Sequence, residues 1–232
     1  MEAAEFDKFA DEYLAIHTDN LKISGERPDY FARYKIDELR RRWSREKRPE
    51  PRAILDFGSG VGASLPHLAQ AFPSATLTAI DVSERSLEIS RQRYPELGAR
   101  VLYSGRGDLP LEAGGFDLVF TACVFHHIDA DQHVELFGRL RKLLRPGGVL
   151  MVFEHNPVNP VTRYIVATCP FDENAVLIPG PVLRARLRAA GFAEADVRYT
   201  GFFPHALAAL RPMEPWLAPV PVGAQYYAFA QA

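Results

Sequence analysis

The sequence predicts an α/β fold, a doubly wound and mostly parallel sheet of seven strands with helices on both faces. Short apolar runs alternate with segments of helical periodicity from residue 53 onward. These runs are apolar throughout rather than at every second position, as in strands that are buried on both faces of a parallel sheet. Glycine and proline separate the segments, and such residues end helices and form turns.

The elements follow one another in regular order. Strands are expected at 53–57, 76–80, 100–103, 116–122, 149–153, 195–203 and 225–230. Helices are expected at 63–72, 83–94, 131–144 and 182–190, the last two ended by Arg145–Gly148 and by Gly191. Residues 1–48 read as helical and 49–232 as one main domain. The connections 154–181 and 203–224 are long, and long loops often carry function.

Composition limits the classes of protein that fit. The formal net charge is −2, so neither a nucleic acid nor an anionic membrane is expected as a partner. Residues 40–48 are rich in arginine, which we interpret as a solvated helix end, with an anionic-ligand patch as the alternative. Cys123 and Cys169 form no disulfide framework, and Cys123 lies in an apolar run typical of a core thiol. The N-terminus has no signal pattern, so a cytoplasmic location is expected.

A glycine-rich turn, Asp56–Gly62, follows the first expected strand. Ligands bind at the carboxyl ends of the strands in sheets of this kind. Glycine permits a tight turn and a close approach of ligand to backbone, and the following helix presents unpaired N–H groups. Gly58, Gly60 and Ala63 also fit the dinucleotide pattern of dehydrogenases, so the turn alone leaves two cofactor classes open.

Carboxylates follow the next two strands. Asp81 comes directly after the second strand, where a carboxylate accepts both hydroxyls of a ribose. A helix N-cap is the alternative role for Asp81, and Ser83 also suits that role. Asp108 follows the third strand and is placed to accept a hydrogen bond from an adenine amino group.

These segments together resemble the class I S-adenosylmethionine-dependent methyltransferases, in the branch that acts on small molecules. Ile54–Gly62 is similar to the family's first motif, Phe116–Phe120 to its fourth-strand motif, and Leu144–Gly148 to the turn before the fifth strand. The resemblance is close over residues 50–155 and loose in the flanks. It implies a Rossmann-like fold with an antiparallel last strand, and a helical lid formed by residues 1–48. Dehydrogenases have no reason to carry all these features in this order.

The resemblance also implies the cofactor contacts, with S-adenosylmethionine as the cofactor. Asp56 and the glycine turn would hold the methionine portion, Asp81 the ribose and Asp108 the adenine. Asp117, on the fourth strand, is expected to be structural. The full expected cofactor set is Asp56, Gly58, Ser59, Gly60, Gly62, Asp81, Val82, Gly107, Asp108, Leu109 and Ala122.

Two histidines follow the fourth strand directly, at the position that lies beside the transferring methyl in this family. Histidine titrates near neutrality, so it suits a general base that deprotonates a hydroxyl acceptor. We expect His127 to be the base, with His126 as the second choice. Glu154 ends the fifth strand and is expected to orient the base or to act on the acceptor. The alternative is that the histidines only shape the pocket wall.

Other polar residues are candidates for acceptor binding. They are Tyr13, Tyr30 and Lys35 in the N-terminal helices, and Asn156, Asn159 and Arg163 after the fifth strand. Helix packing is the alternative for the aromatic residues, and a loop stitched by asparagine side chains for the second group. No metal is expected, because Asp129 and Asp131 alone make a poor site.

The sequence therefore predicts methyl transfer to a small polar metabolite, such as a sugar or natural-product intermediate, with oxygen as the favoured acceptor. N- or C-methylation is the nearest alternative, and a relative that binds the cofactor without catalysis is another. A monomer or homodimer is expected.

Overall fold

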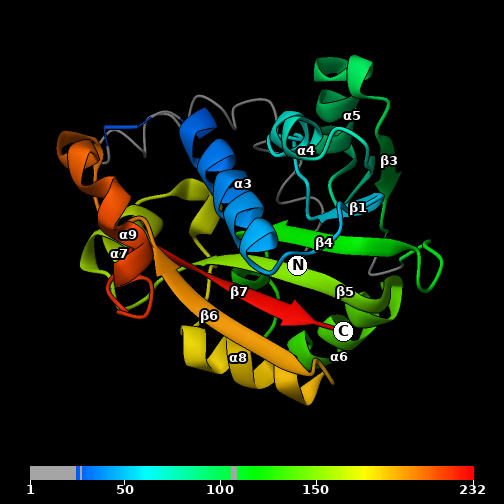
Figure 1. Ribbon diagram of the computed structural model, residues 1–232. Coiled ribbons are helices and arrows are strands. Elements are labelled where there is room, and N and C mark those ends of the chain that lie inside the picture. The colour runs from blue at the N-terminus through cyan, green and yellow to red at the C-terminus, as the bar shows by residue number, and fades with distance from the viewer. Residues whose placement is uncertain (1–24, 27, 106–108) are drawn as a thin grey trace.

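The computed structural model describes residues 25–26, 28–105 and 109–232. The chain forms a seven-stranded sheet with helices on both faces (Figure 1). The strand order is β3-β2-β1-β4-β5-β7-β6, so the order reverses between β1 and β4. The predicted Rossmann-like architecture is confirmed.

The strands lie close to their predicted positions. They are β1 (Ala53–Phe57), β2 (Thr76–Asp81), β3 (Arg100–Tyr103), β4 (Phe116–Ala122), β5 (Leu144–His155), β6 (Glu194–Thr200) and β7 (Gln225–Gln231). Strands β1 to β5 pair in parallel, whereas β7 is antiparallel to both β5 and β6. The antiparallel last strand is therefore confirmed. Strand β5 begins five residues earlier than Val149, where the sequence placed it, because Leu144 already pairs with Phe116 across a register shift.

Helices cover both faces of the sheet. The helices α3 (Pro28–Arg45), α4 (Leu65–Ala71) and α5 (Glu84–Arg93) lie on one face, and α6 (His133–Leu143) and α8 (Gly180–Ala189) on the other (Figure 1). The long connections contain short helices that the sequence did not predict: α7 (Pro160–Ala167), η4 (Pro170–Asp172), η5 (His205–Met213) and α9 (Glu214–Leu217). Among the described residues, no helix has the length and apolar character needed to cross a bilayer.

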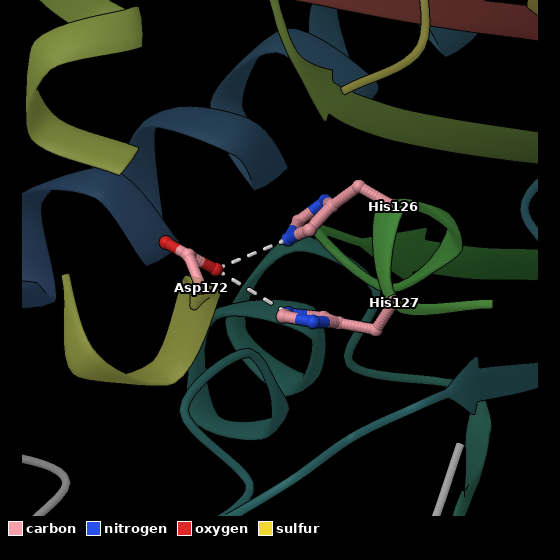
Figure 2. Close-up of side chains that lie close together, drawn as sticks. All are labelled: His126, His127 and Asp172. Atoms are coloured by element: carbon pink, nitrogen blue, oxygen red, sulfur yellow. Dashed lines mark hydrogen bonds and ion pairs between the residues drawn. The ribbon is translucent and has the colours of Figure 1, made fainter. Parts of the chain in front are cut away.

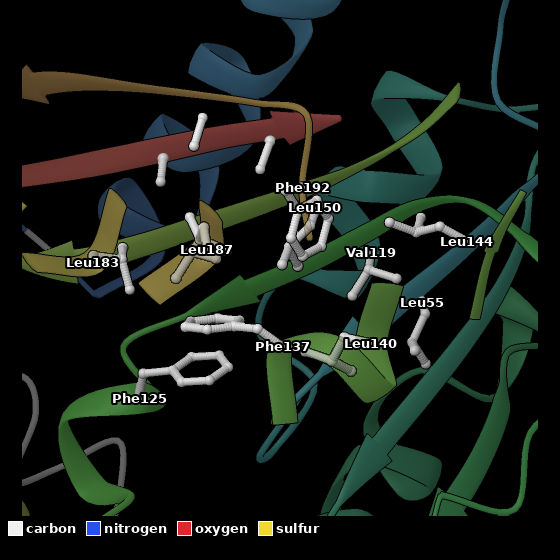
Figure 3. Packing of buried hydrophobic residues seen from close by; sticks show 14 of the residues in the cluster. Leu55, Val119, Phe125, Phe137, Leu140, Leu144, Leu150, Leu183, Leu187 and Phe192 are labelled. Carbon is white, nitrogen blue, oxygen red and sulfur yellow. The ribbon is translucent and has the colours of Figure 1, made fainter. Parts of the chain in front are cut away.

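Two apolar cores explain why the strands are apolar throughout. Leu150 and Val152 of β5 belong to the core beneath α6 and α8, part of which Figure 3 shows. Met151 and Phe153 belong to the core beneath α3 and α4. Successive strand residues point to opposite faces, so a strand that is covered on both sides needs an apolar residue at every position.

Helix α3 is part of the second core. Ile36 and Leu39 are fully buried there, together with Trp43. At the last residue of β6, the Tyr34 hydroxyl bonds Thr200, and it also bonds Glu214. The described part of the predicted lid is thus a sheet-packing helix, and residues 1–24 lie outside the described residues.

Charged side chains near the start of the main domain are paired within the chain. Arg40 pairs with Glu50 at 2.6 Å, and Arg42 pairs with Asp196 at 2.9 Å. This pattern agrees with the interpretation of residues 40–48 as a helix end rather than a ligand patch. Asp117 accepts a bond from Arg145 at 2.7 Å and from the backbone N–H of Ala53 at 2.9 Å, which is the structural role expected of it.

Candidate active site

The turn after β1 needs glycine at three positions. Gly58, Gly60 and Gly62 have φ angles of +72°, +52° and +77°, which side chains rarely adopt. A Cβ atom on Gly58 would lie 2.4 Å from Val124 Cγ2, and one on Gly62 would lie 2.3 Å from Ser90 Oγ. Gly60 has open space where a side chain would stand. The turn therefore brings bare backbone to the point where the strand order reverses.

Asp81 joins the glycine turn to the next helix. Its Oδ2 accepts the Gly60 N–H at 2.8 Å, and its Oδ1 accepts the Ser83 N–H at 2.9 Å. The N-cap of α5 is Ser83, whose Oγ accepts the Ser86 N–H at 3.1 Å. The structure thus gives the N-cap role to Ser83 and leaves the Asp81 carboxylate at the strand end. Ribose binding by Asp81 stays a prediction.

One carboxyl oxygen of Asp56 is buried and accepts no hydrogen bond from the described residues. The residue is 3% exposed, and its Oδ2 has no hydrogen-bond partner among the described residues. Burial raises the pKa of Asp56 to about 7, with help from the nearby Asp81. Ser59 Oγ in the same turn is also buried and unpartnered among the described residues. Buried polar groups are normally bonded, so this pair of atoms suggests a missing ligand.

The remaining predicted cofactor residues divide into two groups. Three of them are partly exposed: Val82 directly after β2, Leu109 in the connection after β3, and Ala122 at the end of β4. Gly107 and Asp108 lie outside the described residues, so the structure says nothing of the predicted adenine contact.

The histidine pair lies in a 3-10 turn, η3 (Phe125–His127), directly after β4. Phe125 is fully buried and stacks on Phe137 of α6 with ring centroids 4.1 Å apart. This anchor holds the turn against the core and fixes where the next two side chains project. Figure 2 shows that both imidazoles point toward Asp172 of η4.

Glu154 orients His126 rather than His127. Its Oε2 lies 2.6 Å from His126 Nδ1. Its Oε1 accepts the backbone N–H groups of Val124 at 3.2 Å and Phe125 at 2.8 Å. Glu154 is 1% exposed, and the contact with His126 lowers its pKa although burial opposes this. The expected orienting role of Glu154 is therefore directed at the second-choice histidine, and the carboxylate is occupied by its own contacts.

The two histidines differ in their protonation. His126 Nε2 lies 3.3 Å from Asp172 Oδ1, so both of its nitrogens face carboxylates. Burial lowers the pKa of His126, but Glu154 and Asp172 outweigh it and raise the pKa to about 10. A protonated imidazole has no lone pair to accept a proton, which argues against His126 as the base. His127 Nε2 lies 3.4 Å from the same oxygen, and burial and the His126 charge lower the pKa of His127.

Cys123 is not the core thiol that its apolar neighbours predict. It is partly exposed at the end of β4 and has a φ of +59°, which is uncommon outside glycine. Lys35 Nζ donates to its Sγ at 3.5 Å. Burial raises the pKa of the thiol, but His155 and Lys35 outweigh it and lower the pKa to about 6. Lys35, a predicted acceptor contact, is thereby brought to the end of β4.

Two of the predicted acceptor contacts have structural partners instead. Asn156 is buried and its Nδ2 donates to Pro221 O at 3.2 Å and Gly223 O at 2.8 Å. Asn159 caps α7 by accepting the Thr162 N–H at 3.0 Å, and its Nδ2 donates to a backbone carbonyl of the same 221–223 segment. Both side chains stitch the loop, as the alternative interpretation from composition has it, and acceptor contact by either one stays a prediction.

Two of the other predicted acceptor contacts, Tyr30 and Arg163, lie on the helices α3 and α7. The Arg211 guanidinium lies 4.7 Å from the ring centroid of Tyr30, which also packs on Phe31. Arg163 is exposed on α7, and Tyr13 lies outside the described residues. The sequence missed Asp172 because no local spacing links it to the histidines. The position of Cys123 could have been predicted from the sequence, because Cys123 follows β4 directly and comes just before the two histidines.

The fold and this site define a class of protein. An open sheet whose glycine turn, acidic residues and histidine pair stand at the carboxyl ends of β1, β2 and β4 is the architecture of a class I methyltransferase. Residues 54–148 match a family model described as a methyltransferase domain. They form a class I domain of the kind that uses S-adenosylmethionine as cofactor.

Particular relatives agree with this assignment. A trans-aconitate 2-methyltransferase of Methylobacterium radiotolerans is 34% identical over 138 residues, 59% of this chain and 51% of the relative. A malonyl-[acyl-carrier protein] O-methyltransferase of Halalkalibacterium halodurans is 29% identical over 126 residues, 53% of this chain and 44% of the relative. The chain thus matches about half the length of each.

A solved structure shares the fold over the whole chain. It is an S-adenosylmethionine-dependent methyltransferase of Thermotoga maritima, described as a possible histamine N-methyltransferase. Its TM-score is 0.65 at 20% identity, and the match covers 98% of both chains.

Proposed function

We propose that the protein transfers a methyl group from S-adenosylmethionine to an oxygen atom of a small polar metabolite. The observation that carries the proposal is the neutral His127 beside the end of β4, paired with Asp172 at 3.4 Å. The names of the two curated relatives, which specify O-methylation or an acid as acceptor, support it.

The residues at the ends of β1 and β2 fit the cofactor. The unpartnered Oδ2 of Asp56 suits the ammonium group of the methionine portion, because a buried carboxylate needs a cation or a donor. The glycine turn lets the chain's backbone approach the ligand, and Asp81 suits the ribose hydroxyls. When bound, the cofactor supplies a methyl group on a positively charged sulfur.

The chain's own contribution to the chemistry is to orient the acceptor and to remove its proton. His127 accepts the proton of an acceptor hydroxyl, and Asp172 stabilises the imidazolium that results. This carboxylate–imidazole arrangement is the one that general-base histidines use elsewhere. Holding the acceptor oxygen in line with the methyl group supplies much of the remaining acceleration.

A carboxylate is the second candidate acceptor. Both trans-aconitate and malonyl groups are acids, and they are named for relatives that this chain matches. A carboxylate is already ionised at neutral pH, so it needs no base. The two acceptors therefore make different demands on His127.

The test compares hydroxyl and carboxylate acceptors in one assay of S-adenosylhomocysteine release. For a hydroxyl acceptor, His127→Ala is expected to lower kcat/KM by about 100-fold or more, because a general base contributes at least that factor. For a carboxylate acceptor, the same variant is expected to keep its activity within a few fold. His67→Ala serves as the matched control, because the His67 side chain is 14% exposed, close to the 12% of His127, and likewise pairs with an aspartate, Asp29.

Two results would overturn the proposal. Equal activity of wild type and His127→Ala on hydroxyl acceptors at every pH would exclude His127 as a general base. It would favour N- or C-methylation. Cofactor consumption at background with every acceptor would indicate a relative that binds the cofactor without transfer.

A further inference from the structure

Three metal-ligating side chains converge beside the strand ends. Ligand atoms of His126, His127 and Asp172 all lie within 4.8 Å of one another. The Nε2 atoms of the two histidines lie 3.3 and 3.4 Å from the same Asp172 oxygen. The three side chains come from two separate elements, η3 and η4, and point toward one another (Figure 2).

These separations match a metal coordination shell. Zinc binds histidine nitrogen at about 2.0–2.1 Å, so neighbouring ligands of a tetrahedral site stand roughly 3.4 Å apart. The two nitrogen–oxygen separations already have this length. The third separation, between the ligand nitrogens of the two histidines, is at most 4.8 Å.

The cluster also has the outer contacts of a metal site. Metal-bound histidines typically donate their second nitrogen to a carboxylate, which fixes the ring. Glu154 Oε2 binds His126 Nδ1 at 2.6 Å, leaving Nε2 directed at Asp172. The η4 segment is fixed as well, since the Val176 N–H donates to the His126 carbonyl at 2.8 Å.

Charge and access favour a divalent cation. The cluster buries two carboxylates, those of Glu154 and Asp172, around His126. A divalent ion in place of the His126 Nε2 proton neutralises both. The His126 side chain is 1% exposed, whereas those of His127 and Asp172 are each 12% exposed. His127 and Asp172 thus form the solvent side of the cluster, and three protein ligands are the number that catalytic zinc sites use.

We infer that His126, His127 and Asp172 form a binding site for a divalent transition metal ion of the zinc type, with Glu154 as the carboxylate behind His126. This goes beyond the proposed function and departs from the sequence expectation of no metal. Two imidazoles and one carboxylate suit zinc, cobalt and iron better than magnesium or calcium, which prefer oxygen ligands. A metal held here uses the Nε2 lone pair of His127, so the metal-bound protein cannot also use His127 as a general base.

The experiment measures Co²⁺ binding to chelator-treated full-length protein by visible absorption, with Zn²⁺ added afterwards as competitor. We expect one Co²⁺ per chain with a four- or five-coordinate spectrum that Zn²⁺ removes. His127→Ala and Asp172→Asn are expected to lose this spectrum. Glu154→Gln is expected to weaken Co²⁺ binding about 10–100-fold, as removal of an outer carboxylate does. His67→Ala, which removes a histidine of α4 that pairs with Asp29, should bind Co²⁺ like wild type.

Circular dichroism and thermal melting verify that each variant is folded, and His127→Ala is the variant least expected to disturb the core. The inference is overturned if wild type does not bind Co²⁺, or if folded His127→Ala binds Co²⁺ as wild type does. The three side chains would then form a hydrogen-bonded network only. The readout is separate from catalysis. Methyl transfer is measured separately, on the chelator-treated protein without added metal. Co²⁺ binding with no methyl transfer in the metal-free protein would refute the proposed function alone, and transfer without Co²⁺ binding would refute the metal site alone.

Discussion

At the scale of single residues, Asp56 combines burial, a missing partner and a pKa near 7. An unfolded chain ionises aspartate near pH 3.9, whereas burial and Asp81 raise the folded pKa of Asp56 to about 7. Between these values, the folded protein keeps a proton that the unfolded chain has lost. The stability from this group is therefore fully present below about pH 4 and is lost as pH rises through 7.

We expect Asp56→Asn to remove this pH dependence in the cofactor-free protein. The difference in unfolding free energy between variant and wild type should grow by up to about 3 kcal/mol in favour of the variant from pH 4.5 to pH 8. Urea denaturation at four pH values measures it, with the exposed Glu112→Gln as control. Parallel pH profiles for wild type and Asp56→Asn would contradict a raised pKa.

Gly62 offers a second prediction at this scale. Gly62→Ala combines a left-handed φ with a contact of 2.3 Å to Ser90 Oγ, whereas Gly98 has a φ of +57° and open space around it. Strain alone costs roughly 1–2 kcal/mol, and forced repacking adds a further 1–3 kcal/mol. Gly62→Ala should therefore lose more unfolding free energy than Gly98→Ala, measured by urea denaturation. Equal losses would show that Ser90 moves aside without cost.

At the scale of elements, the strands were predictable and the loops were not. Strand β5 could be predicted because every position from Val149 to Phe153 faces one core or the other. The short helices α7 and η4 depend on tertiary contacts, such as the bond of Thr162 to the Ala224 carbonyl and the contact of Asp172 with His126. The glycine turn and its carboxylates could be predicted because they are contiguous with strands. Asp172 could not, because only the folded loop brings it to the histidines.

The stitching role of Asn156 predicts a local effect of its removal. Asn156→Ala deletes two donors and one acceptor that tie residues 158 and 221–223 together. A buried bond that is lost leaves unsatisfied groups and costs about 1–3 kcal/mol. We expect faster amide hydrogen exchange in residues 218–224, measured by mass spectrometry, and little change in β1 to β4. Arg163→Ala, on the exposed face of α7, should exchange like wild type, and an equal effect of both variants would refute the stitching role.

At the scale of the whole molecule, the candidate site residues lie at one end of the sheet and residues with a purely structural role lie at the other. Asp56, Asp81, Cys123, the histidines and Glu154 gather at or next to the carboxyl ends of the strands. The other end carries Asp117, which Arg145 and the N–H groups of residues 52 and 53 hold in place. Parallel strands produce this division, because all their carboxyl ends meet at one edge.

This division predicts that some variants lose stability without losing ligand binding, and that others lose ligand binding. S-adenosylhomocysteine at about 100 times its Kd should stabilise the protein by roughly 2.7 kcal/mol, a rise in Tm of roughly 5–10 °C for a chain of this size. Nicotinamide nucleotides should give no rise.

Asp117→Asn should lower the Tm but keep the ligand-induced rise, because Asp117 acts only at the end of the sheet opposite the carboxyl ends of the strands. Asp81→Asn should reduce the rise by half or more, because its carboxylate stands at the strand end and orders Gly60. Thermal melts of all three proteins measure this, and protection by a nicotinamide nucleotide in place of S-adenosylhomocysteine would reverse the assignment of the glycine turn.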